Sequence, residues 1–331
     1  MYRKIMGFLE AWKENEHRKP LILQGARQVG KTYSILEFGR IHYENVAYFN
    51  FETNPKLNET FEEKISPDYL IPILSHIAGQ TIVKEKTLIV FDEVQLCERA
   101  LTSLKYFCED APDYHIIVAG SLLGVAVNRA KISFPVGKVD MKTLYPMDME
   151  EFMIAVGEDE LVEQIKKCFE TNRPMPSALH DAAMQLYRQY LVVGGMPECV
   201  MQFVQTGDYI LIRHTQDTIL TSYLNDMSKY NNLNEIKKTR LAYDNITVQL
   251  SKKNTRFQYK LIKKGGRASE FENAIEWLCL SGIVSQVYRV EQIKKPLENY
   301  RDIDAFKIYV SDLGLLCAKK DLAANDILYM V

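Results

Sequence analysis

Short apolar runs alternate with amphipathic segments through the first part of the chain. The runs that predict strands cover residues 21–24, 45–51, 87–92, 115–120 and 137–142. Apolar residues spaced three and four positions apart predict a helix from Thr32 and another at about 68–79. Strands that alternate with helices are typical of a parallel sheet covered by those helices. We therefore expect an α/β domain with a parallel-sheet core over residues 1–147.

The pattern becomes helical over residues 148–232. The run 182–191 carries apolar residues at helical spacing, and Gly194 with Gly195 predicts a break after it. Pro197 can begin the next helix, because proline suits the first helical turn. We expect a small helical subdomain in which this break is a turn between two helices rather than a contact for a ligand.

The last segment, residues 233–331, combines helices with paired strands. Helical patterns cover about 235–250 and 268–281, and alternating apolar residues predict strands at 283–290 and 305–311. Helices followed by a β-hairpin predict a winged-helix-like domain.

The turn after the first predicted strand carries the most specific chemical signature in the chain. Residues 25–32 read Gly-Ala-Arg-Gln-Val-Gly-Lys-Thr, which satisfies the P-loop pattern G-x-x-x-x-G-K-[ST] between a strand and a helix. Backbone N–H groups of such a loop surround a phosphate, and the N-terminus of the following helix adds attraction. The predicted nucleotide-binding residues are Gly25, Ala26, Arg27, Gln28, Val29, Gly30, Lys31, Thr32 and Tyr33.

A second motif ends the predicted strand at 87–92, where an apolar run leads directly into Asp92 and Glu93. This is the pattern of a Walker B strand, and the carboxyl ends of parallel strands gather ligands at one edge of a sheet. We expect Thr32 and Asp92 to hold Mg²⁺ while Lys31 contacts the β- and γ-phosphates. Glu93 is the candidate general base that orients an attacking water. As an alternative, Glu93 caps the helix that follows.

The predicted strand at 115–120 is followed by Ser121. ATPases with an additional strand between the P-loop strand and the Walker B strand keep a sensor residue at this position. A serine hydroxyl there can contact the γ-phosphate or the attacking water, which makes Ser121 a third candidate catalytic residue. A Gly-Ser pair after a strand is equally ordinary turn chemistry.

Composition limits the class of protein. With 331 residues, 47% of them hydrophobic, the chain can form a sizeable core and divide into two or three units. The longest nearly apolar run, 116–127, is short for a membrane span, and the N-terminal residues lack the core of a signal peptide. Six cysteines without a C-x-x-C pair predict reduced thiols. We therefore expect a soluble cytoplasmic protein that does not bind membranes.

The formal net charge of −2 excludes a uniformly basic nucleic-acid binder. Residues 252–267 depart from this balance, because they include seven basic residues and no acid. Phe257 and Tyr259 are interleaved with these cations, so the stretch could follow a nucleic-acid backbone. A solvated surface is the commoner cause of such runs.

Taken together, these motifs resemble a family of prokaryotic AAA+-like P-loop ATPases that bear a C-terminal domain of unknown function. Besides the two nucleotide motifs, the segments that carry the resemblance are 116–124, 134–138, 144–146, 193–197 and 306–316. The resemblance covers nearly the whole chain. It implies a cytoplasmic ATPase that uses ATP, with Asp92 and Glu93 as Walker B acids and Ser121 near the sensor position.

The chain departs from this family in two respects. Many relatives look as though they have Gly-Arg where this chain has Gly137 and Lys138, and a lysine cannot make the planar two-pronged contact of an arginine finger. Arg129 is an alternative finger or an ordinary helix-surface arginine. Longer relatives continue into a domain that resembles restriction nucleases, so we expect this chain to be truncated at its C-terminus.

The leading functional hypothesis is Mg²⁺-dependent ATP hydrolysis by a conformational switch or motor, which could act as a homo-oligomer. The alternative is an ATP-regulated DNA-binding protein that contacts duplex through residues 252–267. A kinase is a third hypothesis, but Glu93 beside Asp92 suits activation of water better than activation of an acceptor substrate.

Overall fold

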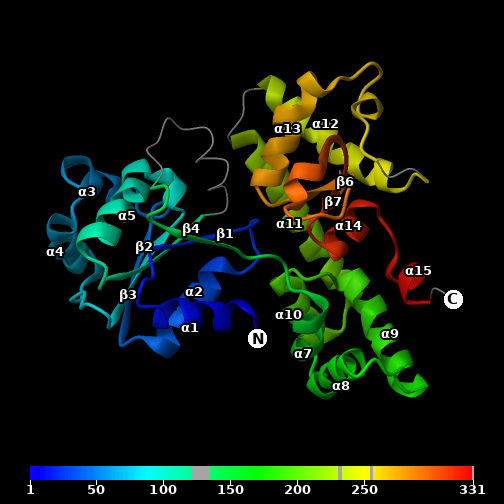
Figure 1. Cartoon of the computed structure of the whole chain (residues 1–331), viewed down its shortest axis with the longest axis horizontal. Helices are drawn as coiled ribbons and strands as arrows, with labels where there is room; N and C mark the ends of the chain where they lie inside the picture. The colour runs from blue at the N-terminus through cyan, green and yellow to red at the C-terminus, as the bar shows by residue number, and fades with distance from the viewer. Residues whose placement is uncertain (121–134, 230–232, 254–255, 330–331) are drawn as a thin grey trace. The chain divides into compact units, whose positions relative to one another are not determined.

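The computed structural model describes residues 1–120, 135–229, 233–253 and 256–329 (Figure 1). The chain divides into two compact units, one formed by Arg3–Leu144 and the other by Met1–Tyr2 with Tyr145–Val331. Within the described residues, no helix combines the length and the apolar character that crossing a membrane requires.

The first unit is built on a five-stranded sheet in the order β2-β3-β4-β1-β5, and every neighbouring pair is parallel. The strands are β1 Leu21–Gln24, β2 Asn45–Asn50, β3 Thr87–Asp92, β4 His115–Gly120 and β5 Asp140–Thr143. Every residue of β3 and β4 is buried, as expected for central strands covered on both faces. The order places β4 between β1 and β3, which confirms the additional strand that the sequence predicts.

Helices cover both faces of this sheet. They are α1 Ile5–Glu14, α2 Lys31–His42, α3 Leu57–Glu63, α4 Pro67–Ala78 and α5 Glu98–Asp110, with a short 3₁₀ helix, η1, at Val94–Leu96. A cluster of phenylalanines that includes Phe49, Phe61 and Phe91 joins α3, α4 and α5 to one face. Helix α2 packs closely on β2 and β3, where Gly39 lies against the side chains of Val46 and Leu88.

The edge strand β5 begins later than the sequence predicts. The expected strand at 137–142 is wrong at its start, because Gly137 has a φ of 73° and the Lys138 N–H bonds to the Pro135 carbonyl in a turn. Pairing with β1 runs instead from Asp140 to Thr143. The shift leaves the backbone of Leu144 beside the turn that follows β1.

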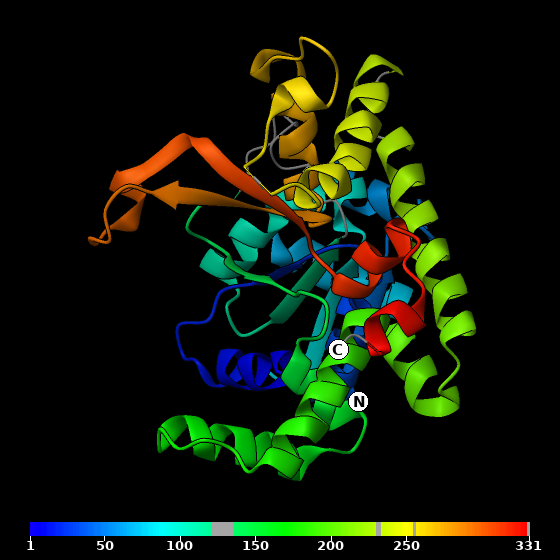
Figure 2. The ribbon, with the colours of Figure 1, turned by 90° about the vertical axis from the view of Figure 1, so that its right-hand side faces the viewer.

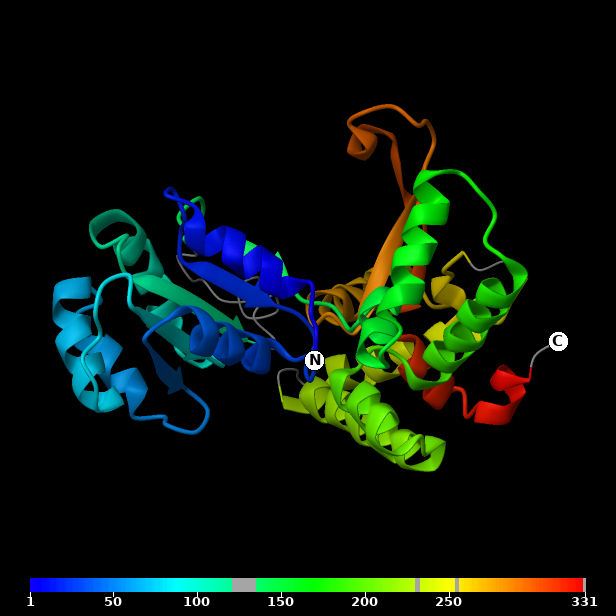
Figure 3. The same ribbon diagram turned by 90° about the horizontal axis from the view of Figure 1, so that it is seen from below.

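The second unit is mostly helical. Its helices are α7 Met149–Ala155, α8 Asp159–Glu170, α9 Ser177–Val193, α10 Pro197–Thr206, α11 Tyr209–Lys229, α12 Leu233–Leu250, α13 Ala268–Leu280, α14 Leu313–Lys319 and α15 Ala324–Leu328. Two short 3₁₀ helices are η2 Tyr259–Leu261 and η3 Leu297–Tyr300. Helices α14 and α15 pack on α9, although more than a hundred residues separate them in sequence (Figures 1 and 3). The break after α9 and the start of α10 at Pro197 confirm the sequence pattern.

An antiparallel hairpin of β6 Val284–Val290 and β7 Arg301–Val310 follows α13. Figure 2 shows it extending outward, with its tip away from the helices of the same unit. Strand β7 starts earlier than predicted, because the polar residues from Arg301 onward hide the alternating pattern. The order of helices and hairpin agrees with the sequence pattern. The winged-helix assignment stays a prediction, and so does the domain boundary at residue 233.

A buried carboxylate ties the turn after α9 to the start of α14. Asp312 accepts hydrogen bonds from the backbone N–H of Gly195 at 2.6 Å and of Leu315 at 2.8 Å. Burial raises the pKa of its carboxyl to about 6 against the opposing effect of these bonds. A Cβ on Gly195 would lie 1.9 Å from the carbonyl oxygen of Met147, so only glycine fits there. Gly194 and Gly195 therefore allow neighbouring backbone segments to pack closely against this turn.

Candidate nucleotide-binding site

The predicted P-loop connects β1 to α2 through a tightly curled turn. Gly25 and Gly30 have φ angles of 148° and 90°, which residues with side chains rarely adopt. A Cβ on Gly25 would also lie 2.2 Å from the backbone oxygen of Leu144. Both glycines are therefore required by the shape of the loop, which delivers the chain into α2 at Lys31.

The Lys31 side chain lies within this loop. Its Nζ donates hydrogen bonds to the carbonyl oxygens of Gly25 at 2.9 Å and Ala26 at 2.8 Å, and the residue is 7% exposed. The ammonium group therefore stands at the N-terminus of α2, where the helix dipole also attracts anions. Tyr33, two residues further along the chain, is 60% exposed.

The P-loop and the Walker B strand meet through side chains. The Thr32 hydroxyl donates a hydrogen bond to Asp92 Oδ2 at 2.9 Å. Asp92 is the last residue of β3 and is 5% exposed. The structure thus brings together the two motifs that sequence reasoning assigned to one site, although β4 separates their strands.

Glu93 follows Asp92 in the left-handed region, with φ 51° and ψ 40°. Its carboxylate accepts a hydrogen bond from the Gln95 side-chain amide. Glu93 stands at the N-cap position of η1, but its side chain makes no capping hydrogen bond to that turn. Gln95 therefore belongs to the site, and sequence reasoning gave it no role.

Sequence reasoning also missed Tyr48 and Asn50 on β2. The Tyr48 hydroxyl donates to Asp92 Oδ2 at 2.7 Å, and Asn50 Nδ2 donates to the Tyr48 oxygen at 3.1 Å. Burial raises the pKa of Tyr48 to about 12, so its hydroxyl stays protonated at neutral pH. The two residues share a strand face because they are two positions apart, and register sets Asn50 opposite Asp92.

Two sequence candidates lie outside the described residues, namely the sensor candidate Ser121 and the arginine-finger alternative Arg129. Lys138, at the position where the sequence resemblance implies an arginine, forms an ion pair with Glu109 at 2.8 Å. The six cysteines are all free, in agreement with the reduced thiols expected from the sequence.

The chemistry of Thr32 and Asp92 fits magnesium. Both offer oxygen atoms, which this hard cation prefers, and they already lie within 2.9 Å of each other. In the described part of the chain, no group of three or more His, Cys, Asp or Glu residues could hold a metal alone. Magnesium typically binds through one or two protein groups together with substrate phosphates, so this sparse donor set matches Mg-nucleotide.

A family model described as an AAA domain matches residues 17–153, which include the P-loop, Asp92 and Glu93. A second model, a domain of unknown function (DUF8612), matches residues 184–326. No curated protein matches the chain.

Solved structures resemble the chain at low sequence identity. The Walker-type ATPase PABY2304 of Pyrococcus abyssi is 14% identical with a TM-score of 0.57, covering 96% of this chain and 95% of that one. The Aeropyrum pernix ORC2 protein is 12% identical with a TM-score of 0.43, over 99% and 94% of the two chains. The Thermotoga maritima RuvB branch migration motor is 14% identical with a TM-score of 0.36, over 85% and 87%. The first likeness shows a shared fold.

The match to the AAA-domain model, the parallel sheet and the likeness to PABY2304 agree on the P-loop ATPase fold that the sequence predicts, followed by a mostly helical region. They support ATP binding and hydrolysis in general.

Proposed function

We propose that this chain binds Mg-ATP at its AAA domain and hydrolyses it. The observation that carries the proposal is the hydrogen bond between Thr32 and Asp92, which joins the P-loop to the Walker B strand. A magnesium ion held by these two residues and the phosphates would neutralise charge as the γ-phosphoryl group leaves. The nucleotide-binding residues are those of the P-loop, Gly25 to Tyr33.

Three residues carry the chemistry in this proposal. Lys31 exchanges its two carbonyl acceptors for phosphate oxygens, which are stronger acceptors because they are charged. Glu93 orients the attacking water and accepts its proton, and Gln95 holds the Glu93 carboxylate in position. Ser121 remains the proposed sensor. We assign the protein to the cytoplasm as a switch or motor that could work as a homo-oligomer.

Substitution of Lys31 tests the binding site. Lys31→Ala removes the ammonium group that lies within the P-loop, so Mg-ATP affinity should fall at least about tenfold, the equivalent of one charged hydrogen bond. Lys86→Ala is the control, because Lys86 is an exposed lysine that pairs with Glu44 on the same unit. Equilibrium binding of a fluorescent ATP analogue measures both. Equal affinity of Lys31→Ala and the parent protein would place the nucleotide elsewhere.

A second candidate function is ATP-regulated DNA binding, which the exposed cations of 252–267 favour. All seven basic residues of this stretch are exposed. The expected role of Phe257 is wrong, however, because its ring is 5% exposed and stacks on Phe306 with centroids 5.5 Å apart. It belongs to the core of the second unit and presents no face to a nucleic acid.

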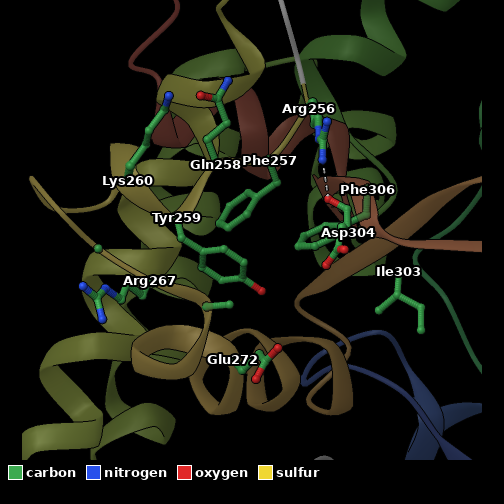
Figure 4. A pocket seen from close by; sticks show the side chains of 12 residues that line it. Arg256, Phe257, Gln258, Tyr259, Lys260, Arg267, Glu272, Ile303, Asp304 and Phe306 are labelled. Atoms are coloured by element: carbon green, nitrogen blue, oxygen red, sulfur yellow. Dashed lines mark hydrogen bonds between the residues drawn. The ribbon is translucent and has the colours of Figure 1, made fainter.

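The same stretch borders a hollow of about 550 Å³. In Figure 4 the Tyr259 hydroxyl points into this hollow, and the charged residues that line it include the cations Lys260 and Arg267 as well as the acids Glu272 and Asp304. Lys260 and Arg267 are both exposed, so a DNA backbone could contact them at the rim of the hollow. Lys260→Ala and Arg267→Ala should each reduce the slope of log affinity against log salt by about 0.9, whereas Lys166→Ala, at an ion pair on α8, should not. Absence of binding to random duplex at low salt would end this alternative.

A further inference from the structure

The Walker B carboxylate is already fully engaged on one oxygen. Asp92 Oδ2 accepts hydrogen bonds from the hydroxyls of Thr32 at 2.9 Å and Tyr48 at 2.7 Å. The other oxygen, Oδ1, accepts the backbone N–H of Glu93 at 2.9 Å. Each oxygen of an ionised carboxylate offers about two lone pairs. A hydrated magnesium ion therefore has no acceptor left on Oδ2 unless one hydroxyl leaves.

The two hydroxyls differ in what they can do beside a metal. Thr32 can keep donating its proton to Asp92 while its own lone pairs face a cation, as expected of a P-loop threonine. Tyr48 reaches Asp92 from β2, outside the P-loop, and its hydroxyl acts on the carboxylate as a hydrogen-bond donor. Tyr48 is 39% exposed, so its ring can turn toward solvent without leaving a buried cavity.

We propose that Tyr48 is a positioning residue that occupies Asp92 Oδ2 in the nucleotide-free AAA domain and leaves it when Mg-nucleotide binds. This inference rests on the proposed function. In the free protein the Tyr48 hydroxyl keeps the buried carboxylate hydrogen-bonded and aimed at Thr32, which limits the cost of an unsatisfied charge. Tyr48 leaves because the magnesium ion and the Tyr48 hydroxyl compete for one oxygen atom, Asp92 Oδ2. Tyr48 thereby sets the magnesium dependence of nucleotide affinity.

Tyr48→Phe tests this competition, because it keeps the ring and removes only the hydroxyl. Mg-ADP should bind about tenfold more tightly to the variant, since a hydrogen bond to a charged acceptor no longer has to be broken. Affinity for ADP in excess EDTA should stay within about twofold of the parent value, since the phosphates alone do not require Tyr48 to leave. A fluorescent ADP analogue, titrated with and without Mg²⁺, reports both constants without turnover.

Tyr69→Phe is the matched control. It removes another phenol hydroxyl from the same unit, one that donates to the exposed carboxylate of Glu63, and should change neither constant. Thermal unfolding of both variants shows that they remain folded. Mg-ADP affinity of Tyr48→Phe equal to or weaker than that of the parent would overturn the inference, because Tyr48 would then support Asp92 in the bound state or play no part. If the parent binds ADP neither with nor without Mg²⁺, the proposed function itself fails.

Discussion

The buried carboxylate of Asp312 makes the stability of the second unit depend on pH. The side chain is buried, and its pKa rises to about 6 from an ordinary value of 3.8. For a carboxyl with a raised pKa the folded state binds the proton more tightly than the unfolded chain. The free energy of unfolding should therefore fall as pH rises through the window between these two values. Above it, the buried charge remains as a constant cost.

The size of the effect follows from the shift. One pKa unit corresponds to about 1.4 kcal/mol, so the full difference amounts to about 3 kcal/mol. Between pH 4.5 and pH 7 the expected loss is about 2 kcal/mol, because part of the titration lies below pH 4.5. Asp312→Asn keeps the shape of the side chain and cannot titrate. The difference in unfolding free energy between parent and variant should therefore change by this amount, while the contributions of all other groups cancel.

The chain contains two tryptophans, which allows the second unit to be observed alone. Trp277 is buried in α13, whereas Trp12 belongs to the first unit. In a Trp12→Phe background, urea unfolding followed by tryptophan fluorescence reports the unit that contains Asp312. Asp208→Asn is the control, since its exposed carboxylate caps the turn before α11 and asparagine caps equally well. The reasoning is refuted if the difference in unfolding free energy between the parent and Asp312→Asn does not change with pH, or changes in the opposite direction.

Two glycines give further predictions. Gly195→Ala should destabilise the second unit by about 3 kcal/mol in urea unfolding, because its Cβ would collide with the Met147 carbonyl. The control Gly207→Ala, at φ 63° in open space, should cost only about 1 kcal/mol. Equal losses of unfolding free energy in the two variants would contradict this. Gly25→Ala should weaken Mg-ATP binding at least about tenfold in the fluorescence titration, because its Cβ would meet the Leu144 oxygen and deform the P-loop. Parent-like affinity would show that the loop adapts.

The strands of the first unit could be predicted because their signals are local. An apolar run bounded by polar residues predicts β1, β3 and β4 with the observed bounds. Helix α1 was not predicted, although its buried residues Ile5, Leu9 and Trp12 have helical spacing. Its ten residues offer too few repeats of the pattern to stand out from a disordered N-terminus.

The rest of the site depends on register and on contacts between distant residues. Tyr48 and Asn50 are ordinary strand residues in sequence, and they join the site only because β2 pairs with β3 so that Asn50 faces Asp92. The contact between Asp312 and Gly195 spans 117 residues. A single sequence carries no signal for either arrangement, because both arise from how the strands and helices pack.

Phosphate release from ATP by the parent protein and by Glu93→Gln, with and without Mg²⁺, tests the central claim most directly. The parent should release phosphate only with Mg²⁺, and Glu93→Gln should bind Mg-ATP with parent affinity while hydrolysing it at least about 100-fold more slowly, the usual contribution of a general base. Glu98→Gln, an exposed residue at the start of α5, should behave like the parent. Equal hydrolysis by Glu93→Gln and the parent, or none by the parent, would contradict the account.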